Sequence, residues 1–422
     1  MIQTWAMIVD SYRELNARKL FWITMALSAL VTLVIACLGI GPKGITFLVW
    51  AFPIEALGTI LNSNTLEPAA FYKIIFITFG FSIWLTWAAM ILALISTANI
   101  IPDFISGGAI DLTLSKPIGR LRLFITKFCT SLLFVALQVG VFTVLAFFVI
   151  GIRGGAWSWG LFWAVPLVVL VFSYLYSVSA LVGMITRSGM AALLVTGLVW
   201  VAIFVVNLAE AGILLNLRTQ YDISVTLHGS EIEKRQKELA AIESDPNAPL
   251  PQEAKPAASD EVKASAKPAW AGMDELNAAD PAAQRAKRVE RLKREIEEFE
   301  KSKAGVEGTA ADLHQYHAIA FAVKTILPKT GETTELLGRV LFEGNEFDGV
   351  QDSMEEERAG PGGRGGRGGI PVGAVRVSQR EVGREVRKEI ESRSVWWVAG
   401  TSGAFMLTML GSACVIFVRR DF

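Results

Sequence analysis

Six long apolar stretches dominate the pattern of hydrophobic and polar positions along this chain of 422 residues. The hydrocarbon core of a bilayer is about 30 Å thick and an α-helix rises about 1.5 Å per residue, so about 20 consecutive apolar residues can span it. In lipid, only a helix satisfies the backbone hydrogen bonds of a single segment. We therefore expect an all-α polytopic membrane protein with six transmembrane helices at residues 21–40, 74–98, 128–150, 161–185, 190–208 and 395–418.

One further apolar segment, residues 45–61, departs from this pattern. It is short and contains Pro53 and Glu55, and a carboxylate at bilayer depth is costly without a partner. We expect this segment to lie in the outer interface or to dip partway into the bilayer as a re-entrant segment. If it spanned the membrane, every later segment would change sides.

The charged residues are concentrated in one part of the chain. About 27 of the 40 Lys and Arg residues and about 32 of the 40 Asp and Glu residues fall within residues 218–394. The chain thus combines a membrane body with one large polar insert between the fifth and sixth helices. The predicted organisation is an interface helix at 1–20, helices 1–5 with a cytoplasmic loop at 21–217, the insert at 218–394, and the sixth helix with its tail at 395–422.

The basic residues of the short loops predict the orientation, because Lys and Arg accumulate on the cytoplasmic side. With the N-terminus in the cytoplasm, the outer set is only Lys43, Lys73 and Arg153. The cytoplasmic set is Arg13, Arg18, Lys19, Lys116, Arg120, Arg122, Lys127, Arg187, Arg419 and Arg420. We expect a multi-pass protein of the inner (plasma) membrane with both termini in the cytoplasm and the insert outside.

The first 20 residues have the spacing of an amphipathic helix. Ile2, Trp5, Tyr12 and Leu15 recur at near-helical intervals, and charged residues occupy much of the rest. Such a helix lies on a membrane surface. The alternative is a plain flanking helix without a mechanical role.

The cytoplasmic loop between the second and third predicted helices, residues 99–127, has the most distinctive sequence. Gly107 and Gly108 permit one sharp turn, and Pro117 with Gly119 permits a second. Between these turns, residues 109–114 can form a short apolar helix with Asp111 near its start. A short helix of this kind suits docking into a cleft on a partner, and the alternative is an ordinary hinge between two spans.

Residues 107–127 contain the run Ile-Asp-Leu-Thr-Leu-Ser-Lys-Pro-Ile-Gly-Arg followed by a Lys at the start of a span. This pattern resembles the permeases of ABC-2 type ABC transporters. It is similar in particular to the six-span subfamily that includes the permease for maturation of nitrous oxide reductase. Residues 419–421, Arg-Arg-Asp, match a motif with which such permeases often end. The resemblance covers the six spans, the N-terminal helix and residues 313–337, but not the bulk of the insert.

The resemblance implies a permease subunit that couples ATP hydrolysis on a separate ABC ATPase subunit to movement of a substrate, with export as the direction. It implies two permease subunits, most simply a homodimer, in the lipid bilayer. The N-terminal helix would be the connecting helix. The residues that would couple the permease to the ATPase are Asp103, Gly107, Gly108, Asp111, Ser115, Lys116, Pro117 and Arg120.

The sequence contains no Gly-x-x-x-x-Gly-Lys-Ser/Thr phosphate-binding loop. ATP would therefore bind only to the partner subunit, and we expect this chain to be neither an enzyme nor the holder of a cofactor. The glycine-rich run at 360–369, with Arg364 and Arg367, lacks an adjoining strand and helix and indicates a flexible connector. We expect no nucleic-acid partner.

The insert shows helical order. Val289, Leu292, Ile296 and Phe299 within 284–303 follow the a/d spacing of a coiled coil. Residues 231–243 carry a weaker matching stripe, and 245–267 has the composition of a disordered linker. A third helical stripe at 382–390 leads toward the sixth span, into which it can continue. We expect a helical stalk outside the membrane that binds a periplasmic partner through residues 231–303; the alternative is a solvated spacer.

Three polar residues near the predicted outer surface are also candidates for a functional role. Residues 313–327 predict an interfacial helix on which His314 and His317 share one face. Two such histidines could bind a metal, but no further ligand has diagnostic spacing, so solvated interface histidines are the simpler interpretation. Glu210, at the outer end of the fifth span, is either a helix-end residue or part of the lining of a transport path.

Two other functions compete with transport. The permease could transmit the motion of the ATPase to a periplasmic partner without moving a solute. It could also be a membrane scaffold with no ATPase, in which case changes at Asp111 or Lys116 would have no effect.

Overall fold

The structure, a computed structural model, describes residues 13, 16, 19–41, 44–47, 50–51, 67–106, 119–244, 281–341 and 369–419. Contacts divide the chain into two compact units. The first comprises Met1–Glu210, Ala320–Arg367 and Glu391–Phe422, and the second comprises Ala211–Ile319 and Gly368–Ile390. Each unit is described by itself.

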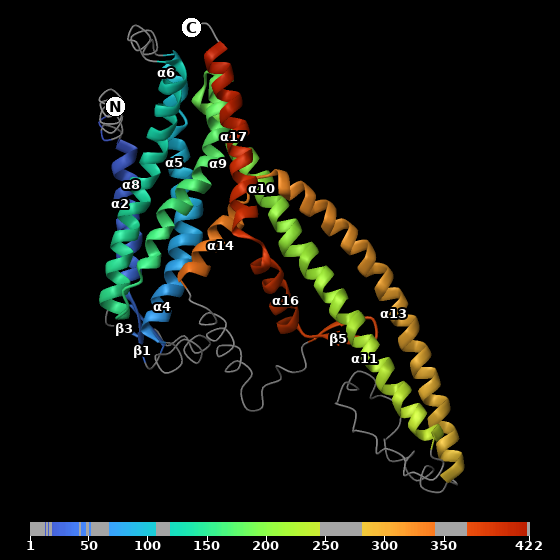
Figure 1. Cartoon of the computed structure of the whole chain (residues 1–422). Helices are drawn as coiled ribbons and strands as arrows, with labels where there is room; N and C mark the ends of the chain where they lie inside the picture. The colour runs from blue at the N-terminus through green and yellow to red at the C-terminus, as the bar shows by residue number, and fades with distance from the viewer. Residues whose placement is uncertain are drawn as a thin grey trace. The chain divides into compact units, whose positions relative to one another are not determined.

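The described residues contain six helices long and apolar enough to cross a membrane, which confirms the predicted all-α multi-pass architecture (Figure 1). Each predicted span lies within one of them, apart from the last residues of the first. The six helical regions are Lys19–Cys37, Pro68–Ile105, Arg120–Gly154, Trp159–Thr186, Gly189–Ser244 and Val395–Arg419.

Several of these regions consist of more than one element. The second combines α4 (Pro68–Ile75), the π-helical segment η1 (Phe76–Ala89), α5 (Met90–Thr97) and α6 (Ile100–Ser106). The fourth begins with a 3₁₀ turn, η2 (Trp159–Trp163), and continues as α9 (Ala164–Thr186). The fifth runs from α10 (Gly189–Asn207) through the π-helical segment η3 (Leu208–Leu215) into α11 (Asn216–Ser244).

The first unit is organised around α9. This helix packs against α8 (Arg120–Gly154), α10 and α17 (Val395–Arg419), while α2 (Lys19–Cys37) packs on the other side of α8. Apolar side chains fill the interior, and aromatic pairs link neighbouring helices. Phe21 of α2 meets Phe134 of α8, and Phe128 of α8 meets Tyr176 of α9. Burial of such rings is the main stabilising term where helices meet.

The first predicted span needs a correction, because its helix ends at Cys37 and not at Ile40. Leu38–Gly41 forms strand β1, which pairs with β2 (Gly44–Phe47), and β2 pairs with β3 (Trp50–Ala51). Ladder pairing between Leu38 and Phe47 satisfies backbone groups that a helix would otherwise satisfy internally. The start of the segment 45–61 is therefore a small antiparallel sheet, while Pro53 and Glu55 lie outside the described residues.

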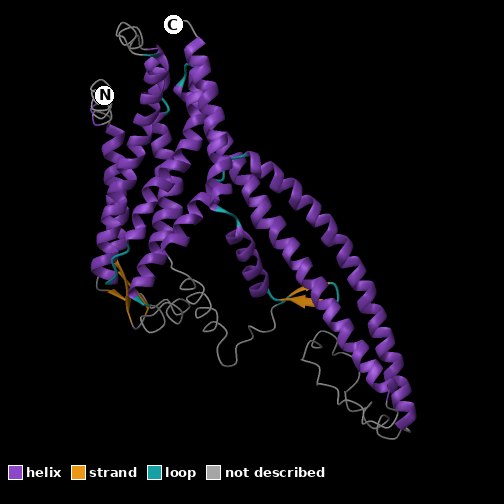
Figure 2. Ribbon diagram, in the orientation of Figure 1, coloured by secondary structure: helices purple, strands orange, loops and turns teal. Residues whose placement is uncertain are grey.

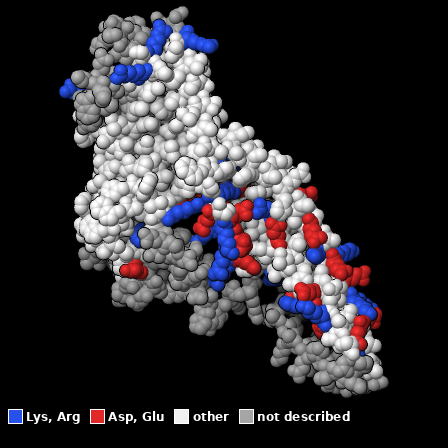
Figure 3. Space-filling view, in the orientation of Figure 1, with Lys and Arg blue, Asp and Glu red and all other residues white. Residues whose placement is uncertain are grey.

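The two ends of the first unit differ in chemistry. One end, which we call the basic end, carries Lys19, Arg120, Arg122, Lys127, Arg187 and Arg419, at the start of α2 and α8, between α9 and α10, and at the end of α17. Figure 3 shows Lys and Arg gathered at this end and uncharged residues over the middle of the visible face. The opposite end of α8 carries an aromatic cluster in which Trp157, Trp159 and Phe162 pack around Phe147. Aromatic rings of this kind collect at membrane–water interfaces.

The second unit contains an antiparallel pair of long helices, α11 and α13 (Pro281–Ile326), which lie side by side (Figure 2). Ion pairs join them along their length: Arg235 binds Glu295, and Arg288 binds Glu238. The helices predicted at 231–243 and 284–303 are thus present as parts of these longer helices, with Leu292 fully buried. The predicted linker 245–267 lies outside the described residues.

Two helix boundaries in this region differ from the prediction. The helix predicted at 313–327 is the last part of α13, which begins at Pro281. The third helical stripe forms α16 (Gln379–Ser392), which does not continue into the sixth span. At the break, Ser394 caps α17 by accepting the backbone N–H of Trp397 at 3.3 Å, and the side chain of Arg393 donates to Glu210.

Candidate functional site

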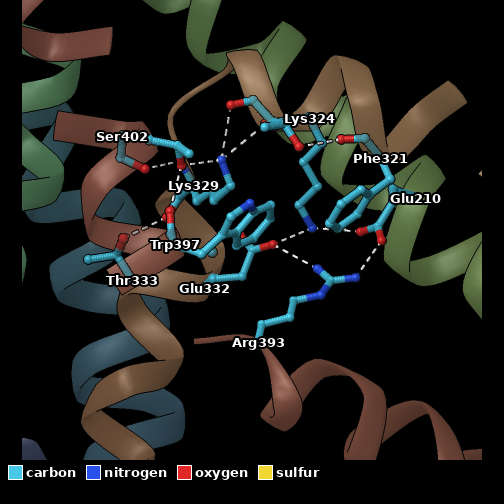
Figure 4. Close-up of polar contacts among 12 residues, drawn as sticks. Glu210, Phe321, Lys324, Lys329, Glu332, Thr333, Arg393, Trp397 and Ser402 are labelled. Carbon is cyan, nitrogen blue, oxygen red and sulfur yellow. Dashed lines mark hydrogen bonds and ion pairs between the residues drawn. The ribbon is translucent and has the colours of Figure 1, made fainter. Parts of the chain in front are cut away.

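Four charged side chains of the first unit form a buried network, which we call the charge cluster: Glu210, Lys324, Glu332 and Arg393 (Figure 4). Lys324 Nζ lies 2.6 Å from Glu210 Oε2 and also binds Glu332 Oε1. Arg393 reaches the same two carboxylates, with Nη2 at 2.5 Å from Glu210 Oε1 and Nη1 at 3.1 Å from Glu332 Oε1. Each cation therefore bridges both anions.

The charge cluster is almost completely removed from solvent. The side chain of Glu210 is 0% exposed, and none of the other three exceeds 8%. Two positive and two negative charges cancel, which is the condition under which buried charges are tolerated. Loss of any one member would leave a net charge in an apolar environment. The cluster thus ties three chain segments together with high geometric specificity.

Local structure positions each member. Glu210 lies in the first turn of η3, a π-helical segment; such segments are rare and are frequent at functional sites. Lys324 lies in the last turn of α13, and Glu332 lies in the first turn of α14 (Thr330–Leu341). Both charges complement the helix dipoles at those ends. Arg393 occupies the break between α16 and α17.

An aromatic pair flanks the charges. The rings of Phe321 and Trp397 stack with centroids 5.1 Å apart and an interplanar angle of 2°. The guanidinium of Arg393 lies over Phe321 at 5.3 Å, and the ammonium of Lys329 lies over Trp397 at 4.2 Å. These cation–π contacts add to the attraction that holds the cations in place.

Lys329 is a fifth buried charge beside the cluster, with 0% exposure. Its Nζ donates to Thr401 Oγ1 at 2.6 Å and to the carbonyls of Thr325 and Lys324 at 3.2 and 3.4 Å, which caps the end of α13. Its backbone N–H donates to Ser402 Oγ at 2.9 Å. Burial lowers the pKa of Lys329 to about 8, opposed by the nearby Glu332 carboxylate.

Residues of the charge cluster lie close in the sequence to three of the four places where the chain passes between the two units. These passages fall after Glu210, before Ala320 and before Glu391. Glu210 is the last residue before the first passage, and Lys324 and Arg393 follow closely after the other two. The cluster therefore holds together, within the first unit, three of the four segments that lead to or from the second unit.

The sequence indicated that Glu210 needs a partner but did not identify that partner. Its position at the end of an apolar span implied that a buried carboxylate would need a partner. Nothing in the local sequence identified Lys324, Glu332 or Arg393, because these residues lie between 114 and 183 positions after Glu210. The structure does not place Glu210 at a helix end, because the helical region continues from Gly189 to Ser244. Its carboxylate oxygens are engaged by Lys324 and Arg393.

Of the predicted ATPase-coupling residues, two are described. Asp103 is exposed in the first turn of α6, and Arg120 opens α8 at the basic end. Arg120 Nη1 donates to the carbonyl of Val418, near the end of α17, at 3.3 Å. The remaining six, Gly107, Gly108, Asp111, Ser115, Lys116 and Pro117, lie outside the described residues.

The two histidines considered as metal ligands have separate partners in the second unit. His314 Nε2 lies 2.9 Å from Asp222 Oδ1, and His317 Nδ1 accepts from Arg218 Nη1 at 3.3 Å. Among the described residues there is no group of three or more His, Cys, Asp or Glu side chains that could hold a metal ion. The histidines therefore belong to two polar contacts that join α11 to α13.

Comparisons with protein families, with curated proteins and with solved structures found no match to this chain.

Proposed function

We propose that this protein is the membrane-spanning permease subunit of an ABC-2 type ABC transporter, driven by a separate ATPase. The observation that carries the proposal is the loop at 99–127. Its sequence resembles the ATPase-coupling region of these permeases, and its described flanks, Asp103 and Arg120, belong to the basic end of a six-helix unit. Positive charge accumulates on the cytoplasmic side of membrane proteins, which is where an ATPase would bind.

The mechanism follows from the rigidity of the flanking helices. α8 runs without interruption over 35 residues from Arg120 to Gly154, so a push on its first turn is carried along its whole length. The contact between Arg120 and the Val418 carbonyl would transmit the same push to α17. Closure of two ATPase subunits beneath a pair of permeases would then tilt these helices and open or shut a path between the permeases. Export of the substrate rests on the resemblance alone.

A second candidate function is transmission of motion to a periplasmic partner without solute transport. The charge cluster favours it, because the cluster fastens together three of the four segments through which the chain passes between its two units. An ion-paired joint resists independent movement of the segments that it connects. In this function the helical pair α11–α13 would bind the partner.

The orientation is tested by cysteine accessibility in intact cells. The three natural cysteines, Cys37, Cys129 and Cys414, are free thiols and are first replaced by serine or alanine. Lys116→Cys is expected to be protected from a membrane-impermeant maleimide, and Ser158→Cys is expected to react. Labelling of Lys116→Cys from outside would refute the proposal.

The ATPase partner is tested by purification from native membranes. An ATP-hydrolysing subunit is expected to co-purify with the wild-type chain and to be lost on replacing Asp111 and Lys116 with alanine. Purification without such a subunit would favour the scaffold instead. Deletion of residues 231–303 separates the two ATP-driven functions: intact solute flux with lost partner binding indicates transport, and the reverse indicates transmission.

A further inference from the structure

Arg153 lies at the end of α8 that is opposite the basic end, close to α4 and strand β1 (Figure 1). Two neutral groups hold its guanidinium: Nε donates to Tyr72 Oη at 2.9 Å, and Nη2 donates to the carbonyl of Leu38 at 3.2 Å. Tyr72 is itself fixed, because it is 2% exposed and its hydroxyl donates to the same carbonyl at 2.6 Å. The direction of the Arg153 side chain is therefore set before any ligand binds, which lowers the entropy cost of binding.

The positive charge of Arg153 has no carboxylate to balance it among the described residues. Tyr72 Oη and the Leu38 carbonyl are neutral acceptors, and they occupy two of the five N–H groups of the guanidinium. Nη1 makes no hydrogen bond within the described part of the chain, and the residue is exposed. The complementary ligand is an anion, and a planar guanidinium suits the paired oxygens of a phosphate.

The same end of α8 is followed by three exposed tryptophans. Trp157, Trp159 and Trp163 are 52%, 73% and 58% exposed. In the ranges that the structure describes, their indole N–H groups have no hydrogen-bond partner, so these groups remain available as donors. Tryptophans of this kind collect at the level of the lipid headgroups, where the ring is in contact with acyl chains and the N–H with polar groups. They therefore place this end of α8, and Arg153 with it, at the depth of the lipid phosphates.

An exposed apolar row on α8 leads to this end. Val144, Phe148 and Ile152 are 41%, 50% and 73% exposed and follow one another at intervals of four residues, so they share one face of the helix. Ile152 directly precedes Arg153. A soluble anion would leave this row uncovered, whereas a phospholipid has acyl chains that cover it and a phosphate that binds the guanidinium. The surface therefore fits a lipid better than a free anion.

We propose that Arg153 binds the phosphate of a phospholipid at this end of α8, with an acyl chain lying along the row of Val144, Phe148 and Ile152. Tyr72 is a positioning residue, because it holds Nε and leaves Nη1 for the phosphate oxygens. The contacts to the phosphate are charge-assisted hydrogen bonds, which are stronger than those between neutral groups. The site needs only the membrane and does not depend on the proposed transport function.

Native mass spectrometry of the full chain in detergent tests the site. The dissociation constant of the first bound phospholipid is measured by titration with dioleoylphosphatidylglycerol. Arg153→Gln removes the charge but keeps an amide that can donate to the Leu38 carbonyl, and we expect it to weaken this binding about tenfold. An unchanged constant would overturn the proposal. A purely structural contact between α8 and β1 would lower the melting temperature in lipid-free detergent and leave the lipid constant as it is.

Arg187→Gln is the matched control, because Arg187 is an exposed arginine at the basic end. This variant is expected to bind the first lipid as the wild type does. Equal weakening in the two variants would show a general attraction of lipid to positive charge and would overturn a site at Arg153.

Two further probes identify the ligand group. Dioleoylglycerol has the same acyl chains without a phosphate, so it is expected to bind about tenfold more weakly than the phospholipid and equally to wild type and Arg153→Gln. Binding as tight as that of the phospholipid would assign the affinity to the apolar row alone and contradict the proposal. Excess inorganic phosphate is expected to leave the lipid bound. Displacement by phosphate would indicate a site for a free anion and would overturn the lipid.

Arg153→Lys decides if Arg153→Gln does not fold. The ammonium keeps the positive charge but lacks the planar arrangement of N–H groups, so we expect binding about threefold weaker than in the wild type. Tyr72→Phe leaves Arg153 in place without the acceptor of its Nε, and a similar weakening is expected. Wild-type constants in both variants would show that the positioned guanidinium does not bind the lipid.

Discussion

Lys324 Nζ lies 2.6 Å from Glu210 Oε2, although the two residues are 114 positions apart in the chain. The side chains are 4% and 0% exposed, so this ion pair is closed to solvent. Arg393 and Glu332 close a second pair around it. The end of the fifth apolar span is thereby fastened to the end of α13 and to Arg393, which lies between α16 and α17.

A double-mutant cycle measures this ion pair. Glu210→Gln leaves the charge cluster with a net positive charge and Lys324→Met leaves it with a net negative charge, so each is expected to cost about 3–5 kcal/mol. The double variant restores neutrality through the remaining pair of Arg393 and Glu332. Its cost is expected to be well below the sum of the two single costs. The free energy of unfolding is measured by denaturant titration in detergent micelles.

An exposed pair provides the control for this cycle. Lys237 and Glu233 are 75% and 66% exposed on α11, and such pairs contribute little to stability because solvent screens them. Neutral variants at these positions should change stability little. Simple additivity at Glu210 and Lys324 would show that the two charges do not act as a pair.

Lys329 predicts a pH dependence of stability. Burial lowers its pKa from 10.5 to about 8. Between these two values the folded protein has released the proton while the unfolded chain still holds it, so stability rises with pH in this window. Below about pH 8 both states are protonated and this contribution no longer changes. The slope attributable to Lys329 is expected to reach about 1.4 kcal/mol per pH unit.

The comparison is between wild type and Lys329→Met from pH 7 to pH 9.5, with thermal unfolding as the readout. The variant removes the titrating group, so its stability should rise less steeply above pH 8. Parallel curves for the two proteins would show that Lys329 keeps its proton when buried.

Replacing glycine by alanine is expected to have opposite effects on stability at two positions of α8. A Cβ at Gly151 would lie 2.5 Å from the ring of Trp157, so Gly151→Ala displaces that ring from its contact with Phe147. We expect a loss of about 1–3 kcal/mol. Gly140 has open space around the same atom, so Gly140→Ala should be neutral or stabilise by up to about 1 kcal/mol. Thermal unfolding and tryptophan fluorescence report both effects. If Gly151→Ala caused no loss of stability, the ring of Trp157 would be free to move aside.

Replacing Arg120 is expected to weaken coupling to the ATPase with little loss of stability. Its guanidinium makes an exposed hydrogen bond to the Val418 carbonyl, so Arg120→Ala should cost at most about 1 kcal/mol of stability. The same change is expected to reduce stimulation of the partner ATPase about fivefold or more, a coupling free energy of about 1 kcal/mol. Lys19→Ala, a basic residue at the same end but outside the loop, is the control. Equal losses of ATPase stimulation in the two variants would show that Arg120 has no specific part in coupling.

The sequence predicted the elements whose cause is local. A run of about 20 apolar residues is helical in lipid whatever surrounds it, and the helices of the insert followed from apolar side chains at regular spacing. The strand pair after Cys37 could not be recognised in this way. The pairing of Leu38 with Phe47 depends on two segments meeting, and an apolar stretch carries the same hydropathy in a strand as in a helix.

The sequence by itself determined that this chain has six segments long and apolar enough to cross a membrane and one long, charge-rich stretch between the fifth and sixth of them, because hydropathy and charge act at each position independently of distant ones. Only the tertiary structure decided which charges are paired. Glu210 needed a cation wherever it was buried, yet the chain offers 40 Lys and Arg residues. The packing of α13, α14 and α17 against one another selected Lys324 and Arg393, because an ion pair depends on a separation of a few ångströms between atoms whose positions no local sequence specifies.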